Sequence, residues 1–381
     1  MKDKSKVKVR YGIVGCGVVS AVHHVPGISI DERAIVTMIC EPNAELLAQR
    51  MEEWGDINPG MRGCADYKEL CADPEIDCVI VATPNFSHHE IVMECLAQKK
   101  HCLAEKPLGL NAAQAQEMAL AAKEAGVCNM TAFTYRFAPA MRYLKQLCAD
   151  GSLGELRHFR SQRFLDWPET SWGWRQYKKT AGAGNLYDMT THRIDFAEDL
   201  MGPIQELTGA VAQFAKRTKT PGGDDVAESE VDDWTSLIGR FESGAVGVWE
   251  GSTLMKGYNQ DGLGREWGEV NGSEATAIYQ VNNPNVITMG KHKGQLEEIP
   301  VPEELLKAKG SPRDPSKGKP GATFRLDLVF EMTSAIVEGR DAECTFLDGA
   351  KAQTVADCVL KSSSGGKWEA VDRSWEAACE K

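Results

Sequence analysis

The sequence predicts an α/β protein with two domains: a doubly wound parallel sheet at the amino-terminal end, then an α+β domain with an open, largely antiparallel sheet. Three observations support this fold class. Short apolar runs alternate with helix-like segments up to about residue 132, which is typical of parallel βαβ units. A glycine-rich turn directly follows the first apolar run. Further along, strand-like runs separated by turns rich in Gly, Asn and Pro occupy residues 204–300.

Length and composition fit this division. At 381 residues the chain can hold two cores, and we expect one domain at residues 1–132 and the other at residues 133–381. The 43 basic and 55 acidic side chains give a net charge of −12, which disfavours nucleic acid as a partner because its phosphates would be repelled. No apolar run suits a membrane span or a signal segment, and the twelve cysteines contain no C-x-x-C motif. We therefore expect a cytoplasmic protein with free thiols and no membrane or nucleic-acid partner.

Each predicted element of the first domain follows from its local pattern. The strand candidates are short and rich in Val, Ile and Cys, whereas the helix candidates are longer and amphipathic. The expected strands span residues 9–15, 34–40, 77–83, 101–105 and 127–133. The clearest helices between them span residues 43–54 and 111–126.

The first strand ends in the turn "GCGVVS", a glycine-rich dinucleotide pattern in which Ser20 replaces the third glycine. Gly15 permits the tight turn, and Gly17 lets backbone amides approach a pyrophosphate at the start of the following helix. Glu41, at the end of the second strand, is placed to bind the ribose hydroxyls and to repel an additional phosphate. The pattern predicts a Rossmann-type domain that binds NAD rather than NADP.

Two later strand ends reach the same edge of the predicted sheet. The run "VATPNFSHHE" ends a strand at Pro84 and Asn85, and "HCLAEKPLGL" ends another at Lys106, just before a proline. Ligands of open α/β sheets bind at the carboxyl ends of the strands, so we expect the Lys106 ammonium to project into that crevice. The predicted cofactor-binding residues are Gly15, Gly17, Val18, Val19, Glu41, Thr83, Pro84, Asn85, His88, Glu105 and Lys106.

These runs carry a resemblance to a known family. "GIVGCGVVS", "VIVATPN", "EKP", "YRFAP" and "GAGNLYDMTTH" occur in the order and approximate spacing of the Gfo/Idh/MocA oxidoreductases, the group of glucose–fructose oxidoreductase and inositol dehydrogenase. The resemblance implies a nicotinamide cofactor, a sugar or polyol substrate, and a second domain used in oligomerisation, hence a homo-oligomer such as a dimer or tetramer. The chain departs from the family pattern at Ser20, Ala183 and Thr190, none of which removes a charge or a proton carrier.

The segment "GAGNLYDMTTHRID" places Asp188 and His192 four residues apart, on one face if the segment is helical, with Asp195 on the same stripe. Three interpretations are open at this point. The pair could be half of a metal site, but the sequence shows no recognisable third ligand, so we expect no metal. An exposed helix pair would have no chemical role. A proton-transfer device fits best, because histidine titrates near neutrality.

We therefore predict His192 as the base, Lys106 as its electrostatic and hydrogen-bonding partner, and Asp188 as the residue that orients the substrate, roles that the resemblance also implies. Nearby aromatic and basic residues suit a carbohydrate pocket, although the tryptophans could instead fill an interface and Arg136 could form an inter-domain salt bridge. The predicted substrate-binding residues are Tyr135, Arg136, Trp172, Trp174, Arg175, Asp188 and His192.

The predicted function is NAD-dependent transfer of a hydride from a secondary hydroxyl of a sugar, glycoside or polyol, with the 3-hydroxyl of a glycoside as one specific expectation. Two alternatives remain. The same first oxidation would serve an NAD-catalysed glycosidase or lyase that returns the hydride. A non-catalytic NAD-binding regulator would predict a disabled proton relay, whereas all three candidate residues are present.

Overall fold

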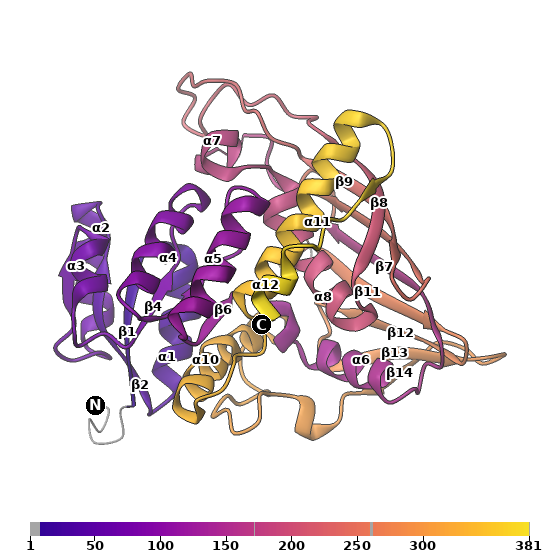
Figure 1. Cartoon of the computed structure of the whole chain (residues 1–381), viewed down its shortest axis with the longest axis horizontal. Helices are drawn as coiled ribbons and strands as arrows, with labels where there is room; N and C mark the ends of the chain where they lie inside the picture. Colours follow the sequence, from indigo (N-terminus) through magenta and orange to yellow (C-terminus); the bar gives the residue numbers. More distant parts are fainter. Residues whose placement is uncertain (1–7, 171, 260–261, 381) are drawn as a thin grey trace.

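The computed structural model describes residues 8–170, 172–259 and 262–380 (Figure 1), so the charged start at residues 1–7 lies outside the described part. Its first layer is a six-stranded, all-parallel sheet with the order β3-β2-β1-β4-β5-β6. The strands are β1 (Val9–Val14), β2 (Ala34–Cys40), β3 (Arg62–Cys64), β4 (Cys78–Val81), β5 (His101–Ala104) and β6 (Asn129–Thr131). The predicted doubly wound sheet is confirmed, and β3 is an additional strand.

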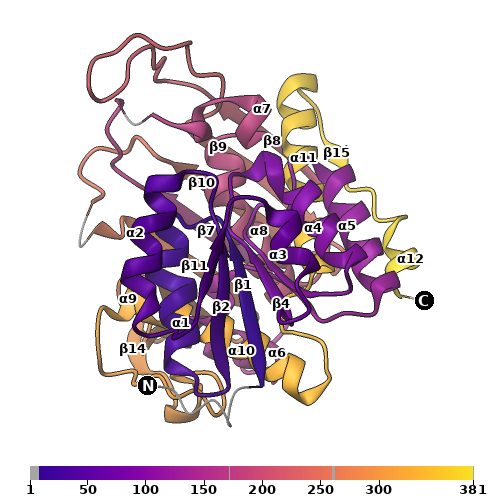
Figure 2. The ribbon, with the colours of Figure 1, turned by 90° about the vertical axis from the view of Figure 1, so that its left-hand side faces the viewer.

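Helices cover both faces of this sheet (Figure 2). A short π-helix (Ser20–His24) runs into α1, which packs with α2 on one face, while α3, α4 and α5 cover the other. Asn43 and Asn111 cap α2 and α5 by accepting hydrogen bonds from the amides of Leu46 and Gln114. The helices are α1 (Val25–Ile30), α2 (Ala44–Gly55), α3 (Tyr67–Ala72), α4 (His88–Ala97) and α5 (Ala112–Ala125).

The second sheet has nine strands in the order β14-β13-β12-β11-β7-β10-β9-β8-β15. Every pairing is antiparallel except that of β10 with β7, so the largely antiparallel prediction is confirmed. Along β9 and β10 buried and exposed residues alternate, and Ile238, Val246 and Val248 are exposed. The strands are β7 (Leu156–Phe164), β8 (Ile204–Ala212), β9 (Trp234–Phe241), β10 (Val246–Ser252), β11 (Arg265–Gly272), β12 (Ala275–Gln280), β13 (Val286–Lys291), β14 (Glu297–Pro300) and β15 (Glu369–Ala370).

The last two long helices connect the two sheets. Helix α10 packs against α1 and β1 of the first sheet, whereas α11 lies between α5 and β8 of the second sheet (Figure 1). The Tyr11 hydroxyl, on β1, lies 2.8 Å from that of Thr333 on α10. The boundary between residues 132 and 133 stays a prediction. The helices are α6 (Pro139–Ala149), α7 (Lys178–Ala181), α8 (Thr191–Met201), α9 (Pro320–Thr323), α10 (Asp327–Glu338), α11 (Phe346–Gly365) and α12 (Glu376–Glu380).

Short helical turns link these elements. They are 3₁₀ turns at Asn85–Ser87, Thr134–Phe137, Trp174–Gln176, Glu303–Leu305 and Phe324–Leu326, and a second π-helix at Leu186–Thr190. Among the described residues, no helix has both the length and the apolar character required to cross a bilayer.

Asp232 anchors the start of the second π-helix. Its carboxylate accepts hydrogen bonds from the amides of Gly184 (2.7 Å) and Leu186 (2.8 Å), and its carbonyl accepts one from Asn185 (2.9 Å). A Cβ at Gly184 would lie 2.0 Å from that carbonyl oxygen. Only glycine permits this contact, so the segment that carries Asp188 and His192 is fixed against β9.

We expect Gly184→Ala to lower the free energy of unfolding by about 1–3 kcal/mol, because the added methyl would overlap a backbone atom that cannot move freely. Urea denaturation measures this effect. The matched control is Gly55→Ala, at the end of α2, where a Cβ meets no atom within 4 Å. Equal stability of the two variants would contradict the proposed close contact.

Candidate active site

Two adjoining cavities lie over the carboxyl ends of β1, β4 and β5. The first, of about 720 Å³, follows the glycine-rich turn and the ends of the first-sheet strands. The second, of about 620 Å³, lies between that sheet and the second one. The residues that line both cavities are Val18, Val19, Glu105, Lys106, Trp174, Arg175 and Asp188.

The glycine-rich turn forms one wall of the first cavity. Gly15 has a φ of 92°, and a Cβ there would lie 2.6 Å from the carbonyl oxygen of Ala82, so glycine is required. A Cβ at Gly17 would meet no protein atom within 4 Å, which leaves open space beside the turn. The Ser20 hydroxyl donates to the Gly15 carbonyl (2.6 Å). Serine in place of the third glycine therefore braces this turn.

The predicted residues at the ends of β2, β4 and β5 line the first cavity with one exception. Glu41, Thr83, Pro84 and Asn85 all border it. Glu41 also accepts a hydrogen bond from the amide of Cys16 (3.1 Å), which holds its carboxylate next to the turn. A dinucleotide fits this wall, since the turn leaves room for phosphates and the carboxylate is placed for ribose hydroxyls.

The exception is His88, which borders neither of the two cavities. Its ring is fully buried behind the cavity wall. The two ring nitrogens lie 3.0 Å from the carbonyl oxygen of Pro107 and 2.9 Å from that of Thr83. His88 therefore holds together the two loops that follow β4 and β5, because its side chain points into the protein instead of out of the helix.

Lys106 and Asp188 form an ion pair where the two cavities meet. The Lys106 ammonium donates to the Asp188 carboxylate (2.9 Å) and to its backbone carbonyl (2.6 Å). The guanidinium of Arg175 lies 3.5 Å from the other carboxylate oxygen. Burial by itself would raise the pKa of Asp188, but Lys106 and Arg175 outweigh it and lower the pKa to about 2. The Asp188 carboxylate is thus ionised at neutral pH.

His192 is the second residue of α8 and lies on the wall of the second cavity. The edge of its ring faces Tyr135, with ring centroids 4.8 Å apart, and its Nδ1 is buried without a hydrogen-bond partner among the described residues. Burial and then the nearby cations, Lys106 first, lower the pKa of His192 well below its usual value. The imidazole is therefore neutral at pH 7 and able to accept a proton.

The aromatic residues expected to bind substrate gather around the second cavity. Trp172 and Trp174 border it, and Trp167 joins them. Trp172 donates from its indole nitrogen to the Tyr177 hydroxyl (3.0 Å). The Arg175 guanidinium lies 4.3 Å from the centre of the Trp174 ring. The cavity thus combines flat apolar surfaces with hydrogen-bond donors, as carbohydrate sites do.

Arg136 and Asp195 both lie away from the two cavities. Arg136 was expected to bind substrate and Asp195 to share the stripe of Asp188 and His192. Instead the two form a buried bidentate pair, at 2.5 and 3.0 Å, and neither borders the two cavities. Three residues after His192, α8 has left the cavity and packs against the 3₁₀ turn that carries Arg136. Arg136 thus forms a salt bridge, but its partner Asp195 lies in the same predicted domain and not across the domain boundary.

The second cavity also contains basic residues that the sequence did not single out. They are His23, Arg163 and Arg325. His23 follows the glycine-rich turn by one helical turn, a position that sequence reasoning could have found. Arg163 and Arg325 come from segments more than 150 residues apart, and no local pattern connects them.

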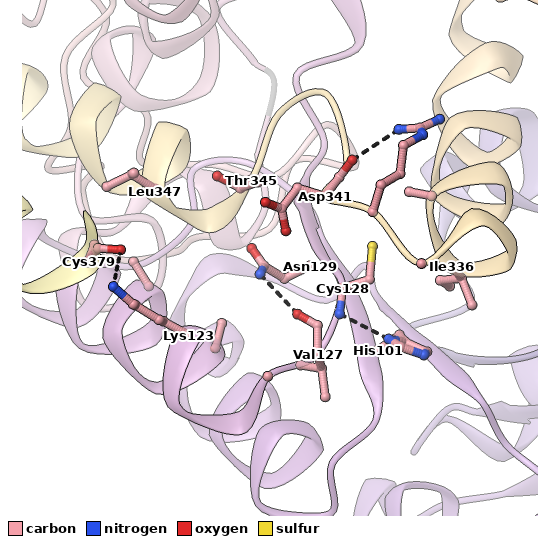
Figure 3. Close-up of a pocket in the computed structure, with 16 residues that line it drawn as sticks. His101, Lys123, Val127, Cys128, Asn129, Ile336, Asp341, Thr345, Leu347 and Cys379 are labelled. Atoms are coloured by element: carbon pink, nitrogen blue, oxygen red, sulfur yellow. Dashed lines mark hydrogen bonds between the residues drawn. The ribbon is translucent and has the colours of Figure 1, made fainter. Parts of the chain in front are cut away.

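A third cavity, of about 630 Å³, lies at the amino-terminal ends of β5 and β6 of the first sheet, and Figure 3 shows its lining residues. Lys123 donates to the carbonyl of Cys379 (2.6 Å), and the ring of His101 accepts from the amide of Cys128 (3.0 Å). Burial raises the pKa of the Cys128 thiol to about 11. His101 and Lys123 are thus engaged with backbone atoms, Arg340 pairs with Glu331 and Glu338, and this cavity is remote from the glycine-rich turn.

Comparison with known families agrees with this geometry. Residues 9–133 match the model described as an oxidoreductase family with an NAD-binding Rossmann fold. Residues 141–278 match the model of the GFO/IDH/MocA C-terminal domain. The protein is thus an NAD-binding oxidoreductase by fold and site. The chain belongs to the GFO/IDH/MocA family.

Individual relatives cover large parts of the chain. Levoglucosan dehydrogenase of Pseudarthrobacter phenanthrenivorans is 26% identical over 351 residues, 87% of this chain and 88% of that protein. Myo-inositol 2-dehydrogenase of Thermotoga maritima is 29% identical over 66% of this chain and 71% of its own length. The 2,7-anhydro-N-acetylneuraminate hydratase of Escherichia coli is 31% identical over 52% of this chain and 51% of its own. A solved structure of levoglucosan dehydrogenase with NADH and levoglucosan has the same fold, with a TM-score of 0.87 at 24% identity over 96% of this chain and all of that one.

We expect Arg136→Met to destabilise the protein by about 3–5 kcal/mol, because it leaves the Asp195 carboxylate buried without its partner. Denaturant unfolding of the variant measures the loss. The exposed pair of Arg157 and Glu155 provides the control, and Arg157→Met should cost less than about 1 kcal/mol. An Arg136→Met protein of normal stability with a raised KM would restore the substrate-binding role.

Proposed function

We propose that this protein is an NAD-dependent dehydrogenase that oxidises a secondary hydroxyl of a sugar, glycoside or polyol. One observation carries the proposal: the ion pair of Lys106 and Asp188 lies at the junction of the two cavities, with the neutral imidazole of His192 in the wall of the second. A hydroxyl bound there would meet a cation and a base together. Two relatives, a levoglucosan dehydrogenase and a myo-inositol 2-dehydrogenase, support the substrate class.

The residues divide the chemistry as follows. Bound nicotinamide supplies the hydride acceptor. Lys106 donates a hydrogen bond to the reacting oxygen and stabilises the negative charge that develops on it. His192 accepts the hydroxyl proton, which its lowered pKa permits at neutral pH. Asp188 keeps the Lys106 ammonium in place and, with its remaining oxygen, orients the substrate.

The first cavity offers the residues that would hold the cofactor. The turn at Gly15 and Gly17, with Val18 and Val19, would receive the pyrophosphate, and Glu41 would bind the adenosine ribose. Thr83, Pro84, Asn85 and Glu105 would line the path toward the nicotinamide. The Glu41 carboxylate supports NAD over NADP, since a 2′-phosphate would be placed against a like charge.

A second candidate function is supported by one relative. The 2,7-anhydro-N-acetylneuraminate relative is named a hydratase, and a hydratase catalyses a reaction without net oxidation. Lys106, Asp188 and His192 would serve the first step of a redox-assisted glycoside cleavage equally well. A non-catalytic regulator is disfavoured because the three residues are brought together and not disabled.

We also propose that the protein is a cytoplasmic homo-oligomer. The twelve cysteines are free thiols, which agrees with a reducing compartment. The open face of the second sheet exposes Ile238, Val246 and Val248, which suits a contact between copies such as a dimer or tetramer.

His192→Ala and Lys106→Met should each reduce kcat/KM by about 10²–10⁴-fold, because each removes a group that acts on the reacting hydroxyl. The assay mixes protein, NAD and a panel of sugars, polyols and aryl glycosides, and follows NADH together with the products. His292→Ala, at an exposed turn, is the matched control and should behave as the wild type. Glycoside cleavage without net NADH would select the second candidate, and unchanged output of His192→Ala would refute both.

The pH dependence follows from the low pKa of His192. As a base it works when unprotonated, so kcat/KM should stay constant as the pH falls through 6.5 and decrease only in more acidic solution. Circular dichroism over the same range verifies that the protein stays folded. The nearby arginines lower the pKa of Tyr135, which lies next to His192, to about 7, so the profile is repeated with Tyr135→Phe. If kcat/KM of this variant still falls with a midpoint at or above pH 6.5, the assignment of His192 as the base is contradicted.

A further inference from the structure

Three arginines surround the ring of Tyr135 at the second cavity. The guanidinium of Arg325 lies 5.0 Å from the ring centre and donates to the Tyr135 hydroxyl (3.1 Å). The guanidinium of Arg193 lies 4.8 Å from the same ring. Arg163 lines the cavity beside them. Arginines cluster in this way where they bind anions, because the planar fork matches carboxylate and phosphate geometry.

The acidic residues nearby do not balance this charge. Glu266 is shared, since it pairs with both Arg163 (3.4 Å) and Arg193. Arg325 has no carboxylate within ion-pair distance in the described part of the chain, and its buried Nε has no hydrogen-bond partner there. The two carboxylates that line the cavity are engaged elsewhere: Asp188 with Lys106, and Glu105 with His24 (3.0 Å).

The pKa values of two neighbouring side chains reflect the excess of positive charge. Burial raises the pKa of Tyr135, but the fields of Arg325, Arg163 and Arg193 outweigh it and lower the pKa to about 7. Burial lowers the pKa of His23 to about 4, with Arg325 as the next cause. A partly buried guanidinium without a counter-ion is costly, and a bound anion would relieve that cost.

The three arginines differ in what they can offer a ligand. Arg193 is fully buried and committed to Glu266 and to the carbonyl of Met189. Arg163 donates to the carbonyl of Leu263 besides its contact with Glu266. Arg325 is half-buried and faces the cavity. Among the described residues, its guanidinium donates a hydrogen bond only to the Tyr135 hydroxyl. It is therefore the arginine available for a ligand.

We propose that the sugar oxidised at this site carries an anionic group, a carboxylate or a phosphate, bound by Arg325 with the support of Arg163. The substrate class is then an acidic sugar, a uronate or aldonate or a sugar phosphate, rather than a neutral polyol. This inference rests on the proposed dehydrogenase function and specifies its substrate. The anion would lie at the arginine wall of the second cavity, while the reacting hydroxyl lies at Lys106 and His192.

The test compares matched compounds in the NAD assay. Methyl glucoside is neutral, methyl glucuronide carries a carboxylate, and glucose 6-phosphate carries a phosphate. We expect kcat/KM for one of the two acidic compounds to exceed that for the neutral one at least about 10-fold, because a charge-assisted hydrogen bond contributes that much or more. The better acidic compound identifies which anion the site takes.

The role of Arg325 is tested with Arg325→Gln, which keeps a polar, hydrogen-bonding side chain, shortens it and removes the charge. The preference for the acidic over the neutral compound should fall about 10–100-fold, and Arg325→Lys should restore part of it. Arg157→Gln, at an exposed position of the second sheet, is the matched control and should keep the wild-type preference. Calorimetric binding of glucuronate and of glucose 6-phosphate, without NAD, provides a readout that does not depend on turnover.

The outcomes separate this inference from the proposed function. Equal or better oxidation of the neutral compound would overturn the inference and leave the dehydrogenase intact. If no compound reduces NAD, the proposed function fails and the calorimetry decides the inference. Binding of an acidic compound that Arg325→Gln abolishes would support the anion site, and absence of binding would overturn it.

Discussion

The site depends on the ion pair between Lys106 and Asp188. Lys106 follows β5 of the first sheet, and Asp188 belongs to the π-helix before α8, 82 residues later, so the pair joins the two halves of the molecule where their cavities meet. Both side chains are mostly buried, which makes the pair costly to form unless each charge is well compensated. The second contact of Lys106, with the Asp188 carbonyl, and the approach of Arg175 supply that compensation. A cation held this firmly can meet a reacting oxygen without reorganisation, which is the condition for electrostatic catalysis.

Other contacts fix the two ends of this pair. Asp232 holds the start of the π-helix, because it accepts hydrogen bonds from three consecutive amides, from Gly184 to Leu186. These bonds attach the segment to the chain just before β9. On the other side, His88 holds the loops after β4 and β5 from behind. π-helical turns are rare and occur often at functional sites, because the wider turn redirects side chains and carbonyls. Here the turn presents both the carboxylate and the carbonyl of Asp188 to one ammonium.

The sequence predicts the parts of this arrangement that depend on local pattern. The strands β1, β2, β4 and β5 follow from apolar runs, and Lys106, Asp188 and His192 from motifs at the ends of elements. Strand β3 is not predicted, because it has only three residues and two of them are exposed. The order of residues does not reveal which way a side chain points, so His88 and Arg136 were assigned to ligands although each is turned inward. Arg325 was missed because only the tertiary fold brings it from the segment after the second sheet to Tyr135.

The charge distribution explains how an acidic protein can hold an anion. The chain carries a net charge of −12, but exposed charges more than about 8 Å away are largely screened at physiological ionic strength. Inside the cavity the effective dielectric constant is lower, and an interaction at 4 Å that contributes about 1 kcal/mol in water contributes about 4 kcal/mol near a protein surface. The arginines around Tyr135 therefore dominate the potential that a bound substrate meets. The same cations lower the pKa of His192, so the charge that would position an acidic sugar also keeps the base unprotonated. In the proposed function, substrate selection and proton transfer would thus depend on one group of cations.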